Sequence, residues 1–458
     1  MISTPKDQQQ TDDQQPLERS TELSSRTQTR LVAALIILAT LNALIWSFVR
    51  VPALGGPDEF DHFKIVQSIV TRGGLAVFEG YGPGAYASGP IRAQVAHEIT
   101  PNGFAIPVAI VISLIGSSEY SFNLHVARLF TVGLYPITLW LAYLTLRRIF
   151  ADVSVAPIWG VAVMATVPMF TLVHSYYTND TPAIAASTFA IYAMVRTWQS
   201  SFAPRDIVLL GIALGVVALH KYTGFLIFPT IMAITLWRFR RDPGRLIRIA
   251  GAIVTLASTI AAWWYIRNWI LYGDPIGVAV TQAAIDSSGG APIPPRARGL
   301  NPIEFVQETN WIRENFATFW GGYGLEKMKL PGAAYVTLTI LIAAAAAGLG
   351  IRMVRVWSRL NRTNLLPLVF IMAFLHLGLW MLSFWSSYSV DVALSGRYVF
   401  PSFLPFIVLV ISGLSALRAW KDRTAALTLA TVPLMVTANA TYFIQTLVPD
   451  VVASGNLT

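Results

Sequence analysis

The chain has 458 residues, of which 54% are hydrophobic and only 12% are charged. Soluble domains are about 25% charged, so a chain this apolar could not cover itself with polar surface in water. The absence of cysteine excludes a disulfide scaffold, a thiolate metal site and a cysteine nucleophile. The net charge of +9 could indicate a nucleic-acid partner, but the placement of the basic residues argues against one.

The first apolar run begins after a polar N-terminal tail. Residues 1–30 are rich in Gln, Ser, Thr and Asp, a composition that predicts a disordered tail. Residues 31–49 are uncharged. About twenty apolar residues cross a bilayer core, so this run predicts a transmembrane helix. It starts too far from the N-terminus for a secretory signal peptide and lacks a small-residue cleavage site.

Further uncharged runs predict ten more transmembrane helices, which makes eleven. Three of them, at 181–195, 207–219 and 222–237, are short and need their polar flanks to reach spanning length. The expected fold class is therefore an all-α polytopic membrane protein. The other seven runs are residues 129–146, 155–173, 249–266, 331–351, 365–383, 398–417 and 424–446.

Residues 103–115 are apolar, but a run this short is typical of a re-entrant or juxtamembrane helix. The positive-inside rule supports this interpretation. If the segment does not cross, most of the 33 lysines and arginines lie on the side of the N-terminal tail. The positive charge is then an orientation signal for a cytoplasmic N-terminus, and no nucleic-acid partner is expected.

Under this topology the membrane domain covers residues 31–449 and has two long extracytoplasmic loops, at 50–128 and 267–330. Residues 450–458 form a short extracytoplasmic tail, and the tail of residues 1–30 is cytoplasmic. The helix cores carry almost no charge, unlike the ion and proton pathways of transporters. His376 lies deep in a span, and we expect it to be hydrogen-bonded packing. The chemistry is therefore expected at the outer ends of the helices.

The first polar group at an outer helix end covers residues 56–63. Pro57 suits the first position of a helix, and acidic side chains favour its N-terminal end. In a helix, Asp58, Asp61 and His62 share one face. Three such groups could bind a metal ion or handle a proton, or they could belong to a solvated amphipathic helix. The spacing fits both interpretations.

Four further polar residues lie at outer helix ends. Asp180 follows the 155–173 span, where it or Asn179 could also act as a helix cap. Lys221 is the only cation in a tight outer hairpin, so it either snorkels or binds an anionic lipid headgroup. Arg267 and Arg397 also lie outside, against the local charge bias, and are candidate phosphate ligands.

Together these groups resemble the motifs of the C-type (GT-C) integral-membrane glycosyltransferases, over residues 30–420. The Asp58-Glu59 pair after the first helix looks like the signature of that superfamily. The form Pro57-Asp58-Glu59-x-x-His62 is similar to a less characterised bacterial branch of the dolichyl-phosphate-mannose-protein mannosyltransferase and aminoarabinose transferase type. Further motifs follow in the expected order: His97-Glu98-Ile99-Thr100-Pro101-Asn102-Gly103, Glu119 through Leu129, Leu219-His220-Lys221-Tyr222 with His220 in place of the usual Thr, Trp264-Tyr265-Ile266-Arg267-Asn268 with Tyr272-Gly273-Asp274-Pro275, and Gly396-Arg397-Tyr398-Val399-Phe400-Pro401.

The resemblance implies transfer of a sugar from a polyprenyl-phosphate donor to a glycan, lipid or protein acceptor. The implied location is the extracytoplasmic face of a bacterial inner membrane. The transfer would be one inverting displacement, in which a carboxylate takes the proton of the acceptor hydroxyl. We assign this role to Asp58, with Glu59 beside it as the second catalytic carboxylate.

The remaining site residues are assigned by charge. Cations stabilise the charge that develops on the leaving phosphate. Metal dependence varies across the superfamily, so the involvement of a divalent cation such as Mg or Mn stays open. The expected phosphate ligands are Lys221, Arg267 and Arg397, and the residues expected to orient the acceptor or hold such a cation are Asp61, His62 and Asp180, together with Glu59.

Two other functions use the same residues differently. A flippase, carrier or polymerase-type protein for lipid-linked saccharides would need the cations but not Asp58, although the sequence lacks a charged path across the bilayer. A purely structural subunit would leave the outer carboxylates unexplained. Superfamily members often bind the acceptor with a soluble C-terminal domain, whereas here we expect the loops to do so. In loop 267–330, three prolines add stiffness and five aromatic residues could stack on sugars or form an interfacial belt: Pro292, Pro294, Pro295, Trp311, Phe316, Phe319, Trp320 and Tyr323.

Overall fold

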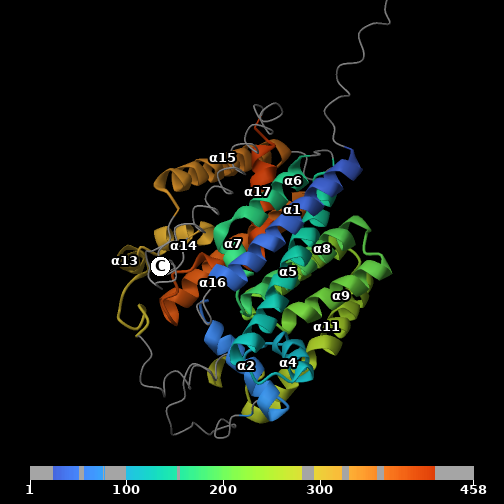
Figure 1. Ribbon diagram of the computed structural model, residues 1–458. Coiled ribbons are helices and arrows are strands. Elements are labelled where there is room, and N and C mark those ends of the chain that lie inside the picture. Colours follow the sequence, from blue (N-terminus) through green and yellow to red (C-terminus); the bar gives the residue numbers. More distant parts are fainter. Residues whose placement is uncertain are drawn as a thin grey trace, which may run out of the picture.

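The computed structural model describes residues 24–50, 56–75, 77, 99–151, 155–280, 293–321, 330–357 and 366–417. Within these ranges the regular elements are all helical (Figure 1). Seven of the helices described are long and apolar enough to cross a membrane. The expected all-α polytopic membrane fold is confirmed. The number of eleven spans stays a prediction, and the run at 424–446 lies outside the described residues.

The first half of the bundle is built around α5 and α8. The N-terminal helix α1 packs on α5 and α6, α5 packs on α8, and α8 packs on α9 (Figure 1). The elements are α1 (Ser25–Ile45), the π-helical turn η1 (Trp46–Arg50), α2 (Glu59–Arg72), α4 (Ala105–Ile115), α5 (Tyr120–Ile149), α6 (Ala156–Thr166), α7 (Pro168–Val173), α8 (Asp180–Gln199) and α9 (Pro204–Ala218).

The second half closes the bundle with longer apolar helices. Helix α11 packs along α9, and α15 and α16 both pack on α17. At the crossing of α15 and α17, Gly413 lies against the backbone of Ala345, where any side chain would clash. Such small residues let membrane helices approach closely. The elements are η2 (Tyr222–Gly224), α10 (Ile227–Phe239), α11 (Pro243–Tyr272), α13 (Pro302–Thr309), α14 (Trp311–Trp320), α15 (Gly332–Trp357), α16 (Leu366–Ser389), η3 (Gly396–Ser402) and α17 (Phe403–Leu414).

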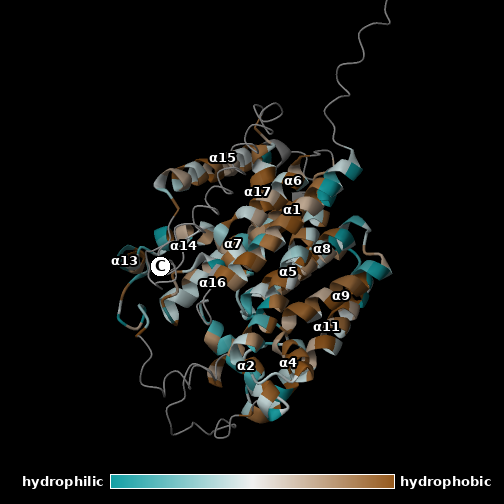
Figure 2. Ribbon diagram, in the orientation of Figure 1, coloured by the Kyte–Doolittle hydropathy of each residue, from teal (hydrophilic) through white to brown (hydrophobic). Residues whose placement is uncertain are grey.

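The basic residues gather at one end of the bundle. Arg147, at the end of α5, donates to the Ser25 hydroxyl at the start of α1 (2.8 Å). Arg245 of α11 reaches the Ser201 carbonyl beyond α8 (3.3 Å). The starts of α2, α5 and α8 lie at the other end, and polar segments mark the helix ends in Figure 2. The structure therefore separates a basic end from the end that carries the outer carboxylates.

The segment predicted not to cross the membrane forms α4, of 11 residues. At about 1.5 Å per residue such a helix covers roughly half of a bilayer core of about 30 Å. It packs on α2, with Ala105, Val108 and Ile112 in one buried cluster with Phe63 and Val66. In Figure 1 the two helices lie together at the lower end of the bundle. A juxtamembrane position agrees with this packing.

The predicted span at 155–173 is not one helix. It divides into α6 and α7 at Val167, whose backbone is extended (φ −67°, ψ 117°). The cause is Pro168, because a proline disfavours the helical conformation of the residue before it. This break lets α7 turn into the segment that leads to Asp180.

Candidate active site

Asp58 lies in a turn that precedes α2. The helix begins at Glu59 rather than at Pro57, and the Glu59 amide donates to the Gly56 carbonyl (3.2 Å). Asp58 has a left-handed backbone, with φ 59° and ψ 11°. A proline followed by a residue with positive φ is the pattern of a type II turn. The prediction that Asp58 shares a helical face with Asp61 and His62 is therefore wrong, since Asp58 is outside the helix.

Glu59 is completely buried in an ion pair. Its carboxylate accepts two hydrogen bonds from Arg128 of α5, from Nε and Nη2, both at 2.7 Å. It also accepts the backbone N–H of Tyr177 (2.8 Å) and that of Gly56 (3.4 Å). Both side chains of the pair are 0% exposed. The structure therefore places Glu59 as a solvent-inaccessible anchor between three chain segments.

The structure does not bring the acidic residues into a metal site. Among the described residues, no three His, Asp or Glu side chains lie close enough to hold a metal ion. Glu59 is neutralised by Arg128, His62 is buried in α2, and Asp61 is half-buried one turn into the helix. The involvement of a divalent cation therefore stays a prediction.

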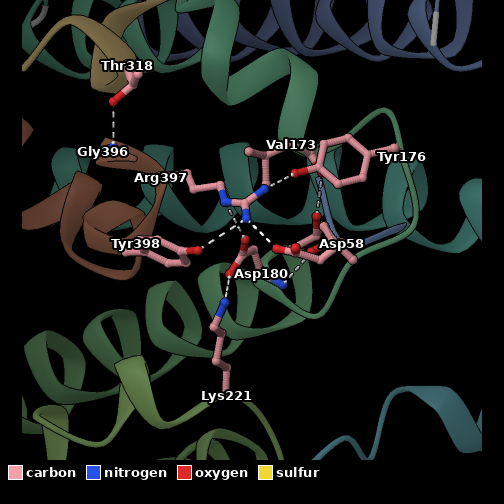
Figure 3. Close-up of polar contacts among 11 residues, drawn as sticks. Asp58, Val173, Tyr176, Asp180, Lys221, Thr318, Gly396, Arg397 and Tyr398 are labelled. Carbon is pink, nitrogen blue, oxygen red and sulfur yellow. Dashed lines mark hydrogen bonds and ion pairs between the residues drawn. The ribbon is translucent and has the colours of Figure 1, made fainter. Parts of the chain in front are cut away.

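Arg397 is the centre of the cluster at this end. Its guanidinium is buried and lies between Asp58, Tyr176, Asp180 and Tyr398 (Figure 3). Nη2 donates to Asp58 Oδ2 (2.6 Å) and Nη1 to the Tyr176 hydroxyl (2.9 Å). Nε lies 3.4 Å from Asp180 Oδ2. Arg397 thus holds two carboxylates from different chain segments, the turn before α2 and the start of α8.

Asp180 joins the second cation to the cluster. It begins α8, and the N-cap residue Asn179 makes no capping hydrogen bond with its side chain. The Asp180 carboxylate instead pairs with Lys221 Nζ (2.6 Å), which also lies over the ring of Tyr398 (4.8 Å). Two carboxylates and two cations therefore balance each other. Asp58 is 45% exposed and Lys221 is 23% exposed, whereas Asp180 and Arg397 are both buried.

The segment that presents Arg397 is supported from two sides. The Gly396 amide donates to the Thr318 hydroxyl of α14 (2.8 Å; Figure 3). Glycine is required here, because a Cβ would lie 2.5 Å from the Asn315 carbonyl. On the other side, His376 bonds the Ser402 hydroxyl (2.9 Å) and accepts from Trp380 (3.1 Å). The expectation that His376 is hydrogen-bonded packing is confirmed.

Arg267 and His174 make contacts of their own near these helix ends. Among the described residues, the groups around Arg397 do not include Arg267, which donates to the amide oxygen of Asn268 (3.1 Å). Asn268 in turn binds the Ile99 carbonyl (2.8 Å), so this part of α11 ties the two long loops together. His174, near Asp180 in sequence, is buried. Burial lowers the pKa of its imidazole to about 4, which keeps it neutral at physiological pH.

Most of the aromatic residues predicted to face sugars belong to the core. Trp311 packs edge-on against Trp380 (ring centroids 5.9 Å apart). Phe316 is half-buried, and Tyr323 and Pro292 lie outside the described residues. The prediction of sugar-stacking faces is wrong for the three aromatic residues that are buried: Trp311, Phe319 and Trp320.

Three residues of the site were given no role in the sequence analysis. Tyr176 and Tyr398 contact Arg397, and Arg128 neutralises Glu59. The available signal was strongest for Arg128, which stands alone between apolar residues close to a predicted span. A charged side chain at such a position requires a partner.

A family model matches part of this chain. It is described as dolichyl-phosphate-mannose-protein mannosyltransferase and matches residues 101–266. The matched range includes three residues of the cluster around Arg397, namely Tyr176, Asp180 and Lys221. It also includes Arg128, the partner of Glu59. No curated protein matches the sequence.

Solved structures of glycosyltransferases share the fold. The crystal structure of ArnT from Cupriavidus metallidurans bound to undecaprenyl phosphate is 15% identical, with a TM-score of 0.50 over 88% of this chain and 63% of that chain. The Archaeoglobus fulgidus oligosaccharyltransferase in its apo form is 13% identical, with a TM-score of 0.53 over 91% of this chain and 55% of that chain. The same enzyme tethered with an acceptor peptide gives a TM-score of 0.55 at 13% identity, over 93% of this chain and 56% of that chain.

These similarities confirm the resemblance to the GT-C superfamily as a shared fold. The chain is an integral membrane protein with that fold. It spans less than two thirds of the length of the solved enzymes that it resembles.

Proposed function

We propose that this protein is a membrane glycosyltransferase that moves a hexose or pentose from a polyprenyl-phosphate donor to an acceptor. The acceptor is a glycan, lipid or protein on the extracytoplasmic face of a bacterial inner membrane. One observation carries the proposal: Asp58 and Lys221 are the two exposed members of a buried, charge-balanced cluster at the outer helix ends. The shared fold and the family-model match support the donor class.

The proposed reaction is a single displacement that inverts the anomeric carbon. The acceptor oxygen bonds to that carbon as the bond to the phosphate oxygen breaks, and the acceptor proton passes to Asp58. A carboxylate within hydrogen-bond reach can serve as this base. Asp58 suits the role because it is exposed while Arg397 fixes one of its oxygens.

Lys221 is the candidate ligand of the leaving phosphate. An ammonium group has three N–H donors, and one of them is directed at Asp180. The others can bind the phosphate, whose negative charge grows as the sugar leaves. Arg397 is buried between acceptors of this chain, so we assign it mainly to holding Asp58. Arg267 remains a second candidate for the phosphate.

The proposal is tested by replacing Asp58 with asparagine. Asparagine has nearly the same shape and also tolerates the left-handed backbone, so Asp58→Asn removes the base without adding strain. General-base catalysis contributes about 10²–10⁴-fold, and we expect a loss of that size with donor binding retained. The matched control is Asp391→Asn, at an exposed carboxylate before η3.

The assay follows transfer of radiolabelled sugars from a panel of polyprenyl-phosphate donors by purified protein in nanodiscs. Near-normal turnover by Asp58→Asn would place the base elsewhere, with Asp180 as the next candidate. Donor binding without transfer by the parent protein to any acceptor would favour a flippase or carrier.

A further inference from the structure

Tyr176 contacts Arg397 and the turn that carries Asp58. Its side chain is fully buried at the end of the α7 segment. The hydroxyl accepts a hydrogen bond from Arg397 Nη1 (2.9 Å). The side chain lies directly against Gly56, so closely that a Cβ on Gly56 would overlap the methylene Cβ of Tyr176 and its ring carbons Cγ and Cδ2. Figure 3 shows Tyr176 beside Asp58 and Arg397.

The Tyr176 ring is one of several contacts that fix the turn carrying Asp58, beside the Gly56 amide on Glu59 (3.4 Å) and the His62 amide on the Asp58 carbonyl (3.0 Å). Gly56 is two residues before Asp58, and the Glu59 amide bonds the Gly56 carbonyl to close the turn. The left-handed backbone of Asp58 is uncommon for a residue other than glycine and persists where the surroundings impose it. Gly56 of this turn packs directly against the Tyr176 ring. The position of the ring therefore contributes to the direction of the Asp58 carboxylate.

We propose that Tyr176 is a positioning residue, whose ring seats the Gly56 turn while its hydroxyl orients Arg397, so that Asp58 is held in place for reaction. The inference rests on the proposed function, because it assigns a purpose to the orientation of Asp58. Tyr176 is fully buried. Its effect passes through Asp58 and Arg397.

The kinetic test removes the hydroxyl and keeps the ring, in Tyr176→Phe. A hydrogen bond to a charged group corresponds to roughly a ten- to hundredfold effect, and we expect kcat to fall by about this factor. The KM for the donor should stay at the parent value, since the donor contacts do not change, and the melting temperature should fall slightly, because Arg397 Nη1 loses its acceptor. Unchanged kcat, or a raised KM at unchanged kcat, would overturn the proposal.

The matched control is the neighbouring tyrosine. Tyr177 is equally buried, and its hydroxyl has no hydrogen-bond partner among the described residues. Tyr177→Phe should therefore keep the kcat of the parent. If both phenylalanine variants lose kcat alike, the loss belongs to the buried segment and not to the hydroxyl on Arg397, which also overturns the proposal.

A second test needs no glycosyl transfer. The chain has no cysteine, so Asp58→Cys introduces a single thiol, at a position whose native side chain is 45% exposed. Arg397 should hold the pKa of this thiol below its usual value of about 8.5. We expect Tyr176→Phe in that background to raise the pKa and Tyr177→Phe to leave it unchanged, measured from the pH dependence of alkylation by iodoacetamide.

The two tests separate this inference from the proposed function. A thiol pKa that is insensitive to Tyr176→Phe would refute the positioning role, whatever the activity. The thiol pKa could instead shift in a protein whose parent transfers no sugar from any donor. That result would refute the glycosyltransferase function and still support the positioning of side chain 58 by Tyr176 and Arg397.

Discussion

The replacement Glu59→Gln separates an anchor from a catalytic group. If Glu59 only orients a substrate or ligand, Glu59→Gln should reduce activity less than Asp58→Asn does. The structure predicts a larger effect of a different kind, because Glu59 is fully buried and neutralises Arg128 through two hydrogen bonds of 2.7 Å. The glutamine amide would leave this guanidinium buried without a counter-charge. We therefore expect Glu59→Gln to destabilise the whole protein.

The magnitude follows from the burial of both partners. Removing one partner of a buried ion pair costs about 3–5 kcal/mol, against a typical total stability of about 5–15 kcal/mol. The hydrogen bond from Arg128 Nη1 to the Ser47 carbonyl (2.7 Å) remains, but it supplies no negative charge. The same change also weakens the link between the Gly56 turn and Tyr177.

The assay is thermal unfolding in detergent, followed by the fluorescence of the 14 tryptophans. A double-mutant cycle with Arg128→Met isolates the pair, and the double variant should be less destabilised than the two single losses together. The control is Glu308→Gln, whose partner Arg298 is equally exposed to solvent (side chains 46% and 40% exposed). An exposed pair contributes about 0–1 kcal/mol. Equal stability of Glu59→Gln and Glu308→Gln would refute the anchoring role.

Two further predictions concern the donor phosphate and the topology. Lys221→Met should weaken donor binding roughly tenfold or more, because a hydrogen bond to a charged group is lost. Lys64→Met, which removes a cation lying over the Phe60 ring of α2, should leave donor affinity unchanged in the same nanodisc titration. For the topology, an impermeant thiol reagent should label Ser288→Cys in intact cells and miss Asp242→Cys. The reverse pattern, or equal labelling, would contradict an extracytoplasmic site.

The sequence predicted which helix ends carry the site, because the number of membrane crossings determines the side on which each helix end lies. Once residues 103–115 are taken not to cross, Asp58, Asp180, Lys221 and Arg397 all fall on one side, and the structure brings these four together. Arg267 falls on the same side yet is not among the groups around Arg397 in the described residues. The order of membrane crossings predicts the side of the membrane on which a residue lies, but not which residues of other helices lie next to it.

The pairing of charges could not be read from the sequence. Arg128 needs a buried carboxylate. Asp58, Glu59 and Asp61 lie so close to one another in the sequence that any of them could supply it. Only the packing of α2 against α5 selects Glu59. Asp61, half-buried on α2, and Asp58, in the turn, are left outside the pair.

The start of α2 was ambiguous for a local reason. Pro57 is favourable both at the first position of a helix and at the second position of a turn. The close contact of Tyr176 with Gly56, together with the buried Glu59 pair, selects the turn. Both are contacts between segments far apart in the sequence, with 69 positions between Glu59 and Arg128, and a local pattern does not contain such contacts.

The charge balance of the cluster explains how proton transfer and departure of the phosphate could reinforce each other. Before the proposed reaction, Arg397 and Lys221 are offset by Asp58 and Asp180. When Asp58 accepts the acceptor proton it becomes neutral, so the cluster gains one uncompensated positive charge. The phosphate gains negative charge in the same step, and buried charges interact more strongly than charges in water. Protonation of Asp58 therefore leaves positive charge of Arg397 and Lys221 unneutralised at the moment when the leaving phosphate becomes more negative.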